Sequence, residues 1–226
     1  MILTPNNQTN LYGLNDEMYS LINLYKKKTL PNKILLSGQK GIGKSTMVYH
    51  LTNYILSEDE EFSYDIKKYK IHENNRSYKL IQNKSNPNFI LIDVMSEKKE
   101  IDINQIRNLI INLNKSSFNQ KPRIILIDNI ELLNTNSVNA LLKNLEEPNN
   151  NIFFFLINNN KKILETLKSR CLNFNIFLSN NKSIEVTRNL IGTENYESIN
   201  KDLLNYYISP GKIYTLIKFI ENNDVD

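Results

Sequence analysis

Eight consecutive residues have the types and spacing that polyphosphate binding requires. They read Gly38-Gln39-Lys40-Gly41-Ile42-Gly43-Lys44-Ser45, with Thr46 next, and match the pattern G-x-x-x-x-G-K-[ST] at every fixed position. The glycines leave room for a phosphate against bare backbone, so that successive N–H groups point into one concavity. Lys44 adds a charge for the outer phosphates and Ser45 a hydroxyl for a magnesium ion. The stretch predicts a phosphate-binding loop (P-loop) leading into a helix whose positive end faces the anion.

A chance glycine turn before an ordinary helix is the alternative interpretation of this stretch. Three of the six glycines of the chain lie within it, however. The apolar run Ile34-Leu35-Leu36 precedes it, and Val48, Leu51 and Ile55 follow it at helical spacing. This order of strand, loop and helix is the context that the motif demands, and it favours phosphate binding.

A carboxylate suited to the same magnesium ion ends another apolar run. Asp128 follows four consecutive aliphatic residues at 124–127, so we expect it at the tip of a buried strand beside the P-loop. A magnesium-directed carboxylate needs this rigid placement. An aspartate after a strand can instead cap a turn. With the P-loop upstream, we interpret Ser45 and Asp128 as the pair that binds magnesium.

The elements that must position these groups are apolar runs separated by amphipathic helices. Runs typical of strands buried on both faces occupy residues 33–37, 89–94, 123–128, 152–157 and 172–178. Helical patterns occupy residues 15–25, the segment after the P-loop, residues 101–113, residues 134 onward to a stop at Pro148, and residues 161–167. Residues 57–88 form an irregular excursion with one or two short helices. The alternation predicts an α/β fold with a five-stranded parallel sheet, helices on both faces, and ligands at the carboxyl ends of the strands.

The strand signal disappears after residue 178. Helical patterns at residues 183–190, 200–207 and 210–221 follow instead. We therefore divide the chain into a nucleotide-binding domain, residues 1–178, and a small all-α lid domain of three helices, residues 179–226.

The composition narrows the classes of function. A chain of 226 residues can hold one good core and a small appendage. The single cysteine, Cys171, excludes an intrachain disulfide and a metal site of several thiolates. No apolar run approaches the eighteen or so residues that span a bilayer, and residues 1–7 lack the features of a signal peptide, so we expect a cytoplasmic protein with no membrane contact. The net charge of +4 is spread along the chain, and the lysine clusters at 26–28 and 67–70 are interpreted as solvated faces rather than a DNA-binding patch.

A helix motif and a short triplet carry a family resemblance. Residues 139–148 read NALLKNLEEP, and Ser169-Arg170-Cys171 follows them. Together they resemble the clamp-loader AAA+ proteins, most closely the delta prime subunits of bacterial DNA polymerase III. The likeness covers essentially the whole chain, through residues 33–45, 85–89, 103–107 and 209–212. It implies an AAA+ P-loop core with a lid, in a subunit of a pentameric ring that uses ATP and magnesium to open a sliding clamp and place it on primed DNA.

The same resemblance implies roles for single residues. Arg170 matches an arginine finger that reaches across an interface to the ATP of a neighbouring subunit, which makes phosphate charge stabilisation depend on assembly. Asn158 matches a polar residue that senses the γ-phosphate. The lid arginine of the family would fall at Gly211, with Lys212 adjacent. Cys171 matches a position without catalytic duty and is expected to pack.

Asn129 stands where AAA+ ATPases normally have the glutamate that polarises the attacking water. An amide has no basic lone pair to accept the proton, and loss of a general base typically costs about 10²–10⁴-fold. Glu131, two residues further on, is not expected to reach back. We therefore expect a protein that binds ATP with weak or no intrinsic ATPase activity. The residues expected to contact ATP and magnesium are Gly38, Gly41, Gly43, Lys44, Ser45, Thr46 and Asp128.

The chain departs from the family pattern in three ways. Many delta prime proteins carry four zinc-binding cysteines between the P-loop and the second strand; none occur here, so we expect no zinc. Better-known delta prime proteins have a degenerate P-loop, whereas this one is intact and favours nucleotide binding. The helical collar domain that holds family rings together would follow residue 226, so the chain is expected to be a shortened form or to assemble through other contacts.

Three other functions compete with a clamp-loader subunit. A self-contained P-loop kinase would need an acceptor pocket and a base within the chain, and no candidate set is found. Another AAA+ ATPase of DNA metabolism, such as a helicase loader or a branch-migration motor, would be expected to have Asp-Glu after the third strand and a lid arginine, against which Asn129 and Gly211 argue. A scaffold that no longer uses nucleotide is disfavoured by the intact P-loop.

Overall fold

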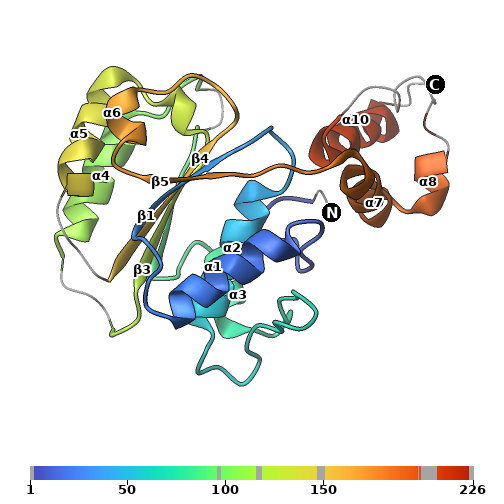
Figure 1. Ribbon diagram of the computed structural model, residues 1–226, viewed down its shortest axis with the longest axis horizontal. Coiled ribbons are helices and arrows are strands. Elements are labelled where there is room, and N and C mark those ends of the chain that lie inside the picture. The colour runs from blue at the N-terminus through green and yellow to red at the C-terminus, as the bar shows by residue number, and fades with distance from the viewer. Residues whose placement is uncertain are drawn as a thin grey trace.

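A parallel sheet forms the centre of the molecule (Figure 1). The structure is a computed structural model that describes residues 3–95, 98–115, 119–146, 151–197, 199 and 208–223. Within these residues the strands are β1 (Lys33–Ser37), β2 (Phe89–Ile92), β3 (Arg123–Ile127), β4 (Ile152–Asn158) and β5 (Leu172–Asn175). All pairings are parallel and the order is β2-β3-β4-β1-β5, which confirms the predicted five-stranded α/β sheet.

The inner strands are buried on both faces. β1 pairs with β4 through Leu35↔Leu156 and with β5 through Leu36↔Phe174. Ile34 and Leu36 join the core on one face of the sheet, whereas Leu35 joins the core on the other. A continuous apolar run is therefore required, because each face meets its own layer of helices.

One face is covered by α1 (Asn15–Lys26), α2 (Lys44–Leu56) and α3 (Arg76–Gln82), as Figure 1 shows. Most of α2 is buried because it lies between the sheet and its two neighbouring helices. The connecting segment (residues 57–75) joins α2 to α3 without a helix of its own. The irregular excursion expected from the sequence is thus confirmed, with α3 as its one described helix.

The opposite face is covered by α4 (Ile103–Leu113), α5 (Thr135–Glu146) and the short α6 (Glu165–Lys168). Asp102 and Gln105 form a capping box at the start of α4. Arg123, the buried first residue of β3, donates to the carbonyls of Asn112 (3.1 Å) and Lys115 (2.7 Å) at the other end of that helix. The guanidinium therefore adds hydrogen bonds to carbonyls at and just beyond the end of the helix, where the regular intrahelical bonds stop.

A helical lobe, called the lid below, follows the sheet. It contains α7 (Asn180–Ile191), α8 (Thr193–Glu197) and α10 (Pro210–Asn223), and α10 packs against α7 (Figure 1). Ser179 accepts a bond from the backbone N–H of Lys182 at the start of α7. The helix expected at residues 200–207 lies outside the described residues, and α8 was not predicted. Every helix in the described part of the chain is too short or too polar to span a bilayer.

Some predicted boundaries were wrong because tertiary contacts set them. The strand expected at residues 172–178 ends at Asn175, and Ile176 then donates one last backbone bond to Ser37 (2.7 Å) before the chain leaves for the lid. The helix expected at residues 161–167 begins only at Glu165. The strand expected at residues 89–94 ends at Ile92.

Candidate nucleotide-binding site

The P-loop joins the end of β1 to the start of α2, as the motif requires. Gly41 and Gly43 have φ angles of +85° and +97°, which residues with a side chain rarely adopt. Gly38 is confined differently, because a Cβ there would lie 2.4 Å from the carbonyl oxygen of Ile176. The fixed glycines of the motif are therefore demanded by the backbone path of this loop.

The ammonium group of Lys44 is held inside the loop. It donates to the carbonyls of Gly38 (2.8 Å) and Gln39 (2.7 Å) and to Oδ1 of Asn159 (3.0 Å). An ammonium group has three donors, and these three bonds use all of them. Burial lowers the pKa of Lys44 to about 8, against the opposing effect of nearby carboxylates. A phosphate bound here must therefore compete with acceptors of the protein itself.

Asp128 follows β3 and lies beside the start of α2. Its carboxylate accepts bonds from the Ser45 hydroxyl and from the backbone N–H of Asn129 (2.8 Å). Burial raises the pKa of Asp128 and the charge of Asp93 adds to the rise, although the bond from Ser45 opposes it. A buried carboxylate beside a hydroxyl and a second carboxylate gives the hard oxygen donors that magnesium prefers, so these residues fit the ion.

A network of amides connects the ends of β3 and β4. Asn129, in a left-handed conformation with φ of +54°, donates to Asp93 (2.7 Å) and accepts from Nδ2 of Asn159 (2.9 Å). Asn159 Nδ2 also donates to Glu131 (3.0 Å). The 3₁₀ turn Ile130–Leu132 after Asn129 brings Glu131 to Asn159, but Glu131 is not among the described residues that line the cavity, so the expectation that it does not reach back as a base stays a prediction.

Asn158 and its neighbour Asn159 make different contacts in the structure. Asn158 accepts from the backbone N–H of Lys161 (3.1 Å) and donates to the carbonyl of the same residue (3.0 Å), so its side chain closes the turn after β4. Asn159 is the residue that contacts Lys44. No sequence signal distinguishes the two residues, because the run of asparagines at 158–160 hides the register and β4 is buried at every position.

These groups line one end of a cavity of about 630 Å³, a volume ordinary for a small-molecule site. The P-loop end consists of residues 40–46, which include Thr46, together with Asp128, Asn129 and Asn159. Residues 3–12, called the wall segment below, supply most of a second side. The lid supplies the third side through Val186, Leu190 and the start of α10.

The lid touches the P-loop directly. The backbone N–H of Gly211 donates to the carbonyl of Gly41 (2.9 Å), and a Cβ at Gly211 would lie only 2.9 Å from that oxygen. Lys212, the next residue, lines the cavity. Gly211, the position expected to match the lid arginine of the family, is thus in close backbone contact with the P-loop. The positive charge on this side of the cavity comes from Lys212.

Arg170 lies apart from this cavity. It follows α6, is exposed, and donates through Nη1 to the carbonyl of Thr166 (2.8 Å). It is absent from the described lining of the cavity. Cys171 beside it is partly buried, and burial raises the pKa of its thiol to about 11. The expected finger therefore lies outside the lining of the candidate nucleotide site of its own chain.

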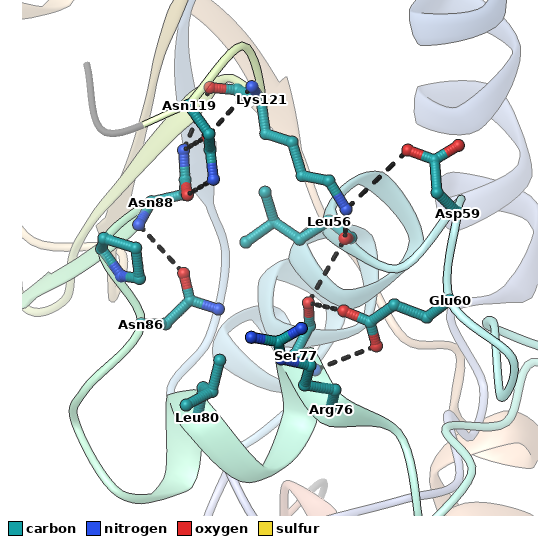
Figure 2. Close-up of a pocket in the computed structure, with 11 residues that line it drawn as sticks. Leu56, Asp59, Glu60, Arg76, Ser77, Leu80, Asn86, Asn88, Asn119 and Lys121 are labelled. Carbon is teal, nitrogen blue, oxygen red and sulfur yellow. Dashed lines mark hydrogen bonds and ion pairs between the residues drawn. The ribbon is translucent and has the colours of Figure 1, made fainter.

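A second cavity, of about 290 Å³, lies where β2 and β3 begin (Figure 2). Its polar groups bond to one another, as Figure 2 shows: Ser77 to Glu60, Lys121 to the carbonyl of Leu56, and Asn88 to Asn119. The cavity beside the P-loop is therefore the better candidate site. Among the described residues, no three side chains of His, Cys, Asp or Glu gather where they could hold a metal ion.

Comparison with known proteins places this chain in a replication family. Residues 14–179 match the family model described as "DNA polymerase III, delta subunit", and the chain belongs to this family. The resemblance to the AAA+ clamp-loader proteins inferred from the sequence is thereby confirmed.

Two curated relatives come from Buchnera aphidicola subsp. Schizaphis graminum. The DNA polymerase III subunit gamma is 32% identical over 151 residues, which are 66% of this chain and 39% of the relative. The subunit delta′ is 28% identical over 158 residues, 69% of this chain and 46% of the relative. The match thus spans less than half the length of either relative. A solved DNA polymerase III gamma subunit-related protein of Thermotoga maritima is 19% identical with a TM-score of 0.47, over 78% of this chain and 52% of that one.

Proposed function

We propose that this chain is a subunit of a DNA polymerase III clamp loader that binds ATP with magnesium. The observation that carries the nucleotide proposal is the convergence of the Lys44 ammonium, the Ser45 hydroxyl and the Asp128 carboxylate at one end of the 630 Å³ cavity. The clamp-loader role is supported by membership of the family and by relatives that are gamma and delta′ subunits of DNA polymerase III.

Each of these groups would have a distinct task. The backbone around Gly38, Gly41 and Gly43 would cradle the phosphates, and Lys44 would leave one of its present acceptors for them. Ser45 and Asp128 would hold the magnesium ion, which when bound neutralises phosphate charge. Thr46 lies next along the cavity lining and would contact the phosphates beside the first turn of α2.

Hydrolysis by this chain alone would be weak. The amide of Asn129 is held between Asp93 and Asn159, and it has no basic lone pair to activate water. The carboxylate of Glu131 accepts bonds from both the backbone and the side chain of Asn159. The chain would then act as an ATP-holding subunit.

Chemistry at the neighbouring site would depend on assembly. Arg170, exposed and outside the cavity of its own chain, would be offered to the ATP of an adjacent subunit. Residues 1–178 would form the nucleotide-binding domain and residues 179–226 the lid domain. Other clamp-loader subunits, the sliding clamp and primed DNA would be the partners.

Calorimetric titration of the chain with ATP and magnesium tests the nucleotide proposal. Saturable binding is expected for the wild type and for the exposed-lysine control Lys67→Ala, whereas Lys44→Ala removes the charge inside the P-loop and is expected to abolish binding. Phosphate release followed in the same samples should be slow. Binding that persists unchanged in Lys44→Ala would contradict the assignment.

A nucleotide-independent scaffold is the second candidate, and two observations favour it. All three donors of Lys44 are used within the chain, and the lid bonds to the P-loop at Gly41. The same titration separates the two functions, because a scaffold shows no saturable binding in the wild type.

A further inference from the structure

The wall segment gives the cavity a chemical character unlike that of the P-loop end. Four of the seven residues that it contributes to the cavity lining have apolar or aromatic side chains, namely Leu3, Pro5, Leu11 and Tyr12, and the other three are Thr4, Gln8 and Asn10. A polyphosphate gains nothing from such a surface, because removing charged oxygens from water is costly without donors. A base with flat apolar faces suits it. The wall segment therefore faces the part of the cavity suited to a nucleoside.

Backbone bonds attach the wall segment to the connecting segment. Ile71 donates its N–H to the carbonyl of Thr9 (2.8 Å), and Leu11 donates to the carbonyl of Tyr69 (3.1 Å). Asn10 and Lys70 form an antiparallel bridge between these bonds. The wall segment thus takes its position from residues about sixty positions further along the chain.

Two buried side chains of the α2 and α3 layer complete this attachment. The Tyr78 hydroxyl donates to the carbonyl of Asn7 (3.2 Å). His50 is fully buried, with Nε2 3.1 Å from the carbonyl of Gln8 and Nδ1 3.0 Å from the hydroxyl of Tyr64. A carbonyl only accepts, so Nε2 carries a proton; because burial lowers the pKa of His50, the ring is neutral and Nδ1 accepts from the tyrosine. His50 therefore joins the wall segment to the connecting segment as a neutral ring.

The connecting segment is itself fixed to α2 and α3. Asn75 accepts from Nδ2 of Asn53 (2.7 Å) and donates to the carbonyl of Phe62 (2.6 Å). Glu60 accepts from both the amide and the hydroxyl of Ser77, as Figure 2 shows. The anchor of the wall is therefore a part of the core that includes the P-loop helix.

From these contacts we infer that His50 and Tyr78 are positioning residues that hold the wall segment in place, and so set the affinity of the cavity for the nucleoside part of its ligand rather than for the phosphates. The inference rests on the proposed function, because it requires that the cavity bind a nucleotide. It gives the connecting segment, which contributes no residue to the cavity lining, a role in recognition.

Two probes separate this role from a structural one. Magnesium ATP reports on the whole site, whereas magnesium tripolyphosphate reports on the P-loop end alone. His50→Leu removes both ring nitrogens and is expected to raise the dissociation constant for ATP about tenfold, and Tyr78→Phe about threefold, which are the effects of losing one or two ordinary hydrogen bonds. The dissociation constant for tripolyphosphate is expected to stay within about twofold of the wild type.

Two further variants sharpen the experiment. His50→Gln keeps an amide donor near the place of Nε2 and is expected to restore most of the ATP affinity. Tyr25→Phe makes the same chemical change as Tyr78→Phe on α1, away from the wall segment, and is expected to match the wild type. Should His50→Leu fail to fold, Tyr78→Phe decides the question.

Three outcomes would overturn the inference. They are equal weakening of both probes, unchanged ATP affinity in the folded variants, and a wild type that binds tripolyphosphate as tightly as ATP. A wild type that binds neither probe would instead refute the proposed function, and the inference with it.

Discussion

Lys44 and His50 lie on the same helix, and burial lowers the pKa of both, yet at neutral pH Lys44 is charged and His50 is not. Burial brings the pKa of Lys44 to about 8, and the nearby carboxylates Asp128 and Glu131 favour its protonated form. Burial brings the pKa of His50 to about 4, and the carbonyl of Gln8 opposes this shift without cancelling it. At neutral pH one end of α2 thus presents a cation to the P-loop and its middle carries a neutral ring.

His50 is expected to make the protein sensitive to acid. Its pKa is about 4 in the folded chain and 6.5 when unperturbed, so the unfolded chain takes up the proton first as the pH falls. The stabilising contribution is therefore present above pH 6.5 and is lost between pH 6.5 and 4, by about 3 kcal/mol over the whole range. Urea denaturation of the wild type and His50→Gln at several pH values measures this contribution as the difference between their free energies of unfolding. If that difference did not change with pH, the prediction would be contradicted.

Part of the candidate site could be predicted from the sequence because the P-loop motif has a fixed spacing. Lys44, Ser45 and Asp128 lie together as expected because the P-loop motif places the first two, and the parallel sheet brings the carboxyl ends of β1 and β3 to one edge. The contact of Lys44 with Asn159 and that of Glu131 with Asn159 depend on how β4 and a 3₁₀ turn meet the loop. No local pattern encodes such a contact.

The same distinction holds for whole elements. The strand at 33–37 was predicted with its observed bounds, because Pro31-Asn32 and Gly38 punctuate it locally. The late start of α6 and the early end of β5 follow from contacts between elements: the turn that Asn158 closes at Lys161, and the departure of the chain toward the lid. The connecting segment was correctly expected to be irregular, but its backbone pairing with residues 9–11 could not be predicted.

The contact between α10 and the P-loop makes Gly211 a sensitive position. In Gly211→Ala the new Cβ would meet the carbonyl oxygen of Gly41 at 2.9 Å and its Cα at 3.0 Å, and backbone cannot turn aside as a flexible side chain can. We expect α10 to move from the loop, with a loss of about 1–3 kcal/mol in the free energy of unfolding. Hydrogen exchange at residues 211–214 should become faster. Leu216→Ala, at an exposed position on the same helix, serves as the control. Exchange in Gly211→Ala as slow as in the wild type would argue against a tight contact.

At the scale of the whole molecule, the cavity proposed to bind ATP and the proposed arginine finger, Arg170, lie on different parts of the core. The cavity is enclosed by the wall segment, the P-loop and the lid, whereas Arg170 follows α6, on the part of the core that lies away from the lid in Figure 1. Arg170 therefore does not contact the candidate nucleotide site of its own chain in this structure. This arrangement suits a subunit whose arginine acts on a neighbour.

Arg170→Ala tests this arrangement, because the substitution should leave ATP binding by the isolated chain unchanged but slow ATP hydrolysis by the assembled ring. The dissociation constant of the isolated chain for ATP is expected to stay within about twofold of the wild type, since the side chain lies outside the cavity. In the reconstituted ring, loss of a guanidinium delivered in trans should slow ATP hydrolysis at the adjoining site by about 10³-fold or more. Arg170→Lys keeps the charge but loses the planar donors, so it should recover only part of the rate. A ring with undiminished hydrolysis would show that the arginine serves the surface of its own chain, where it already bonds to the carbonyl of Thr166.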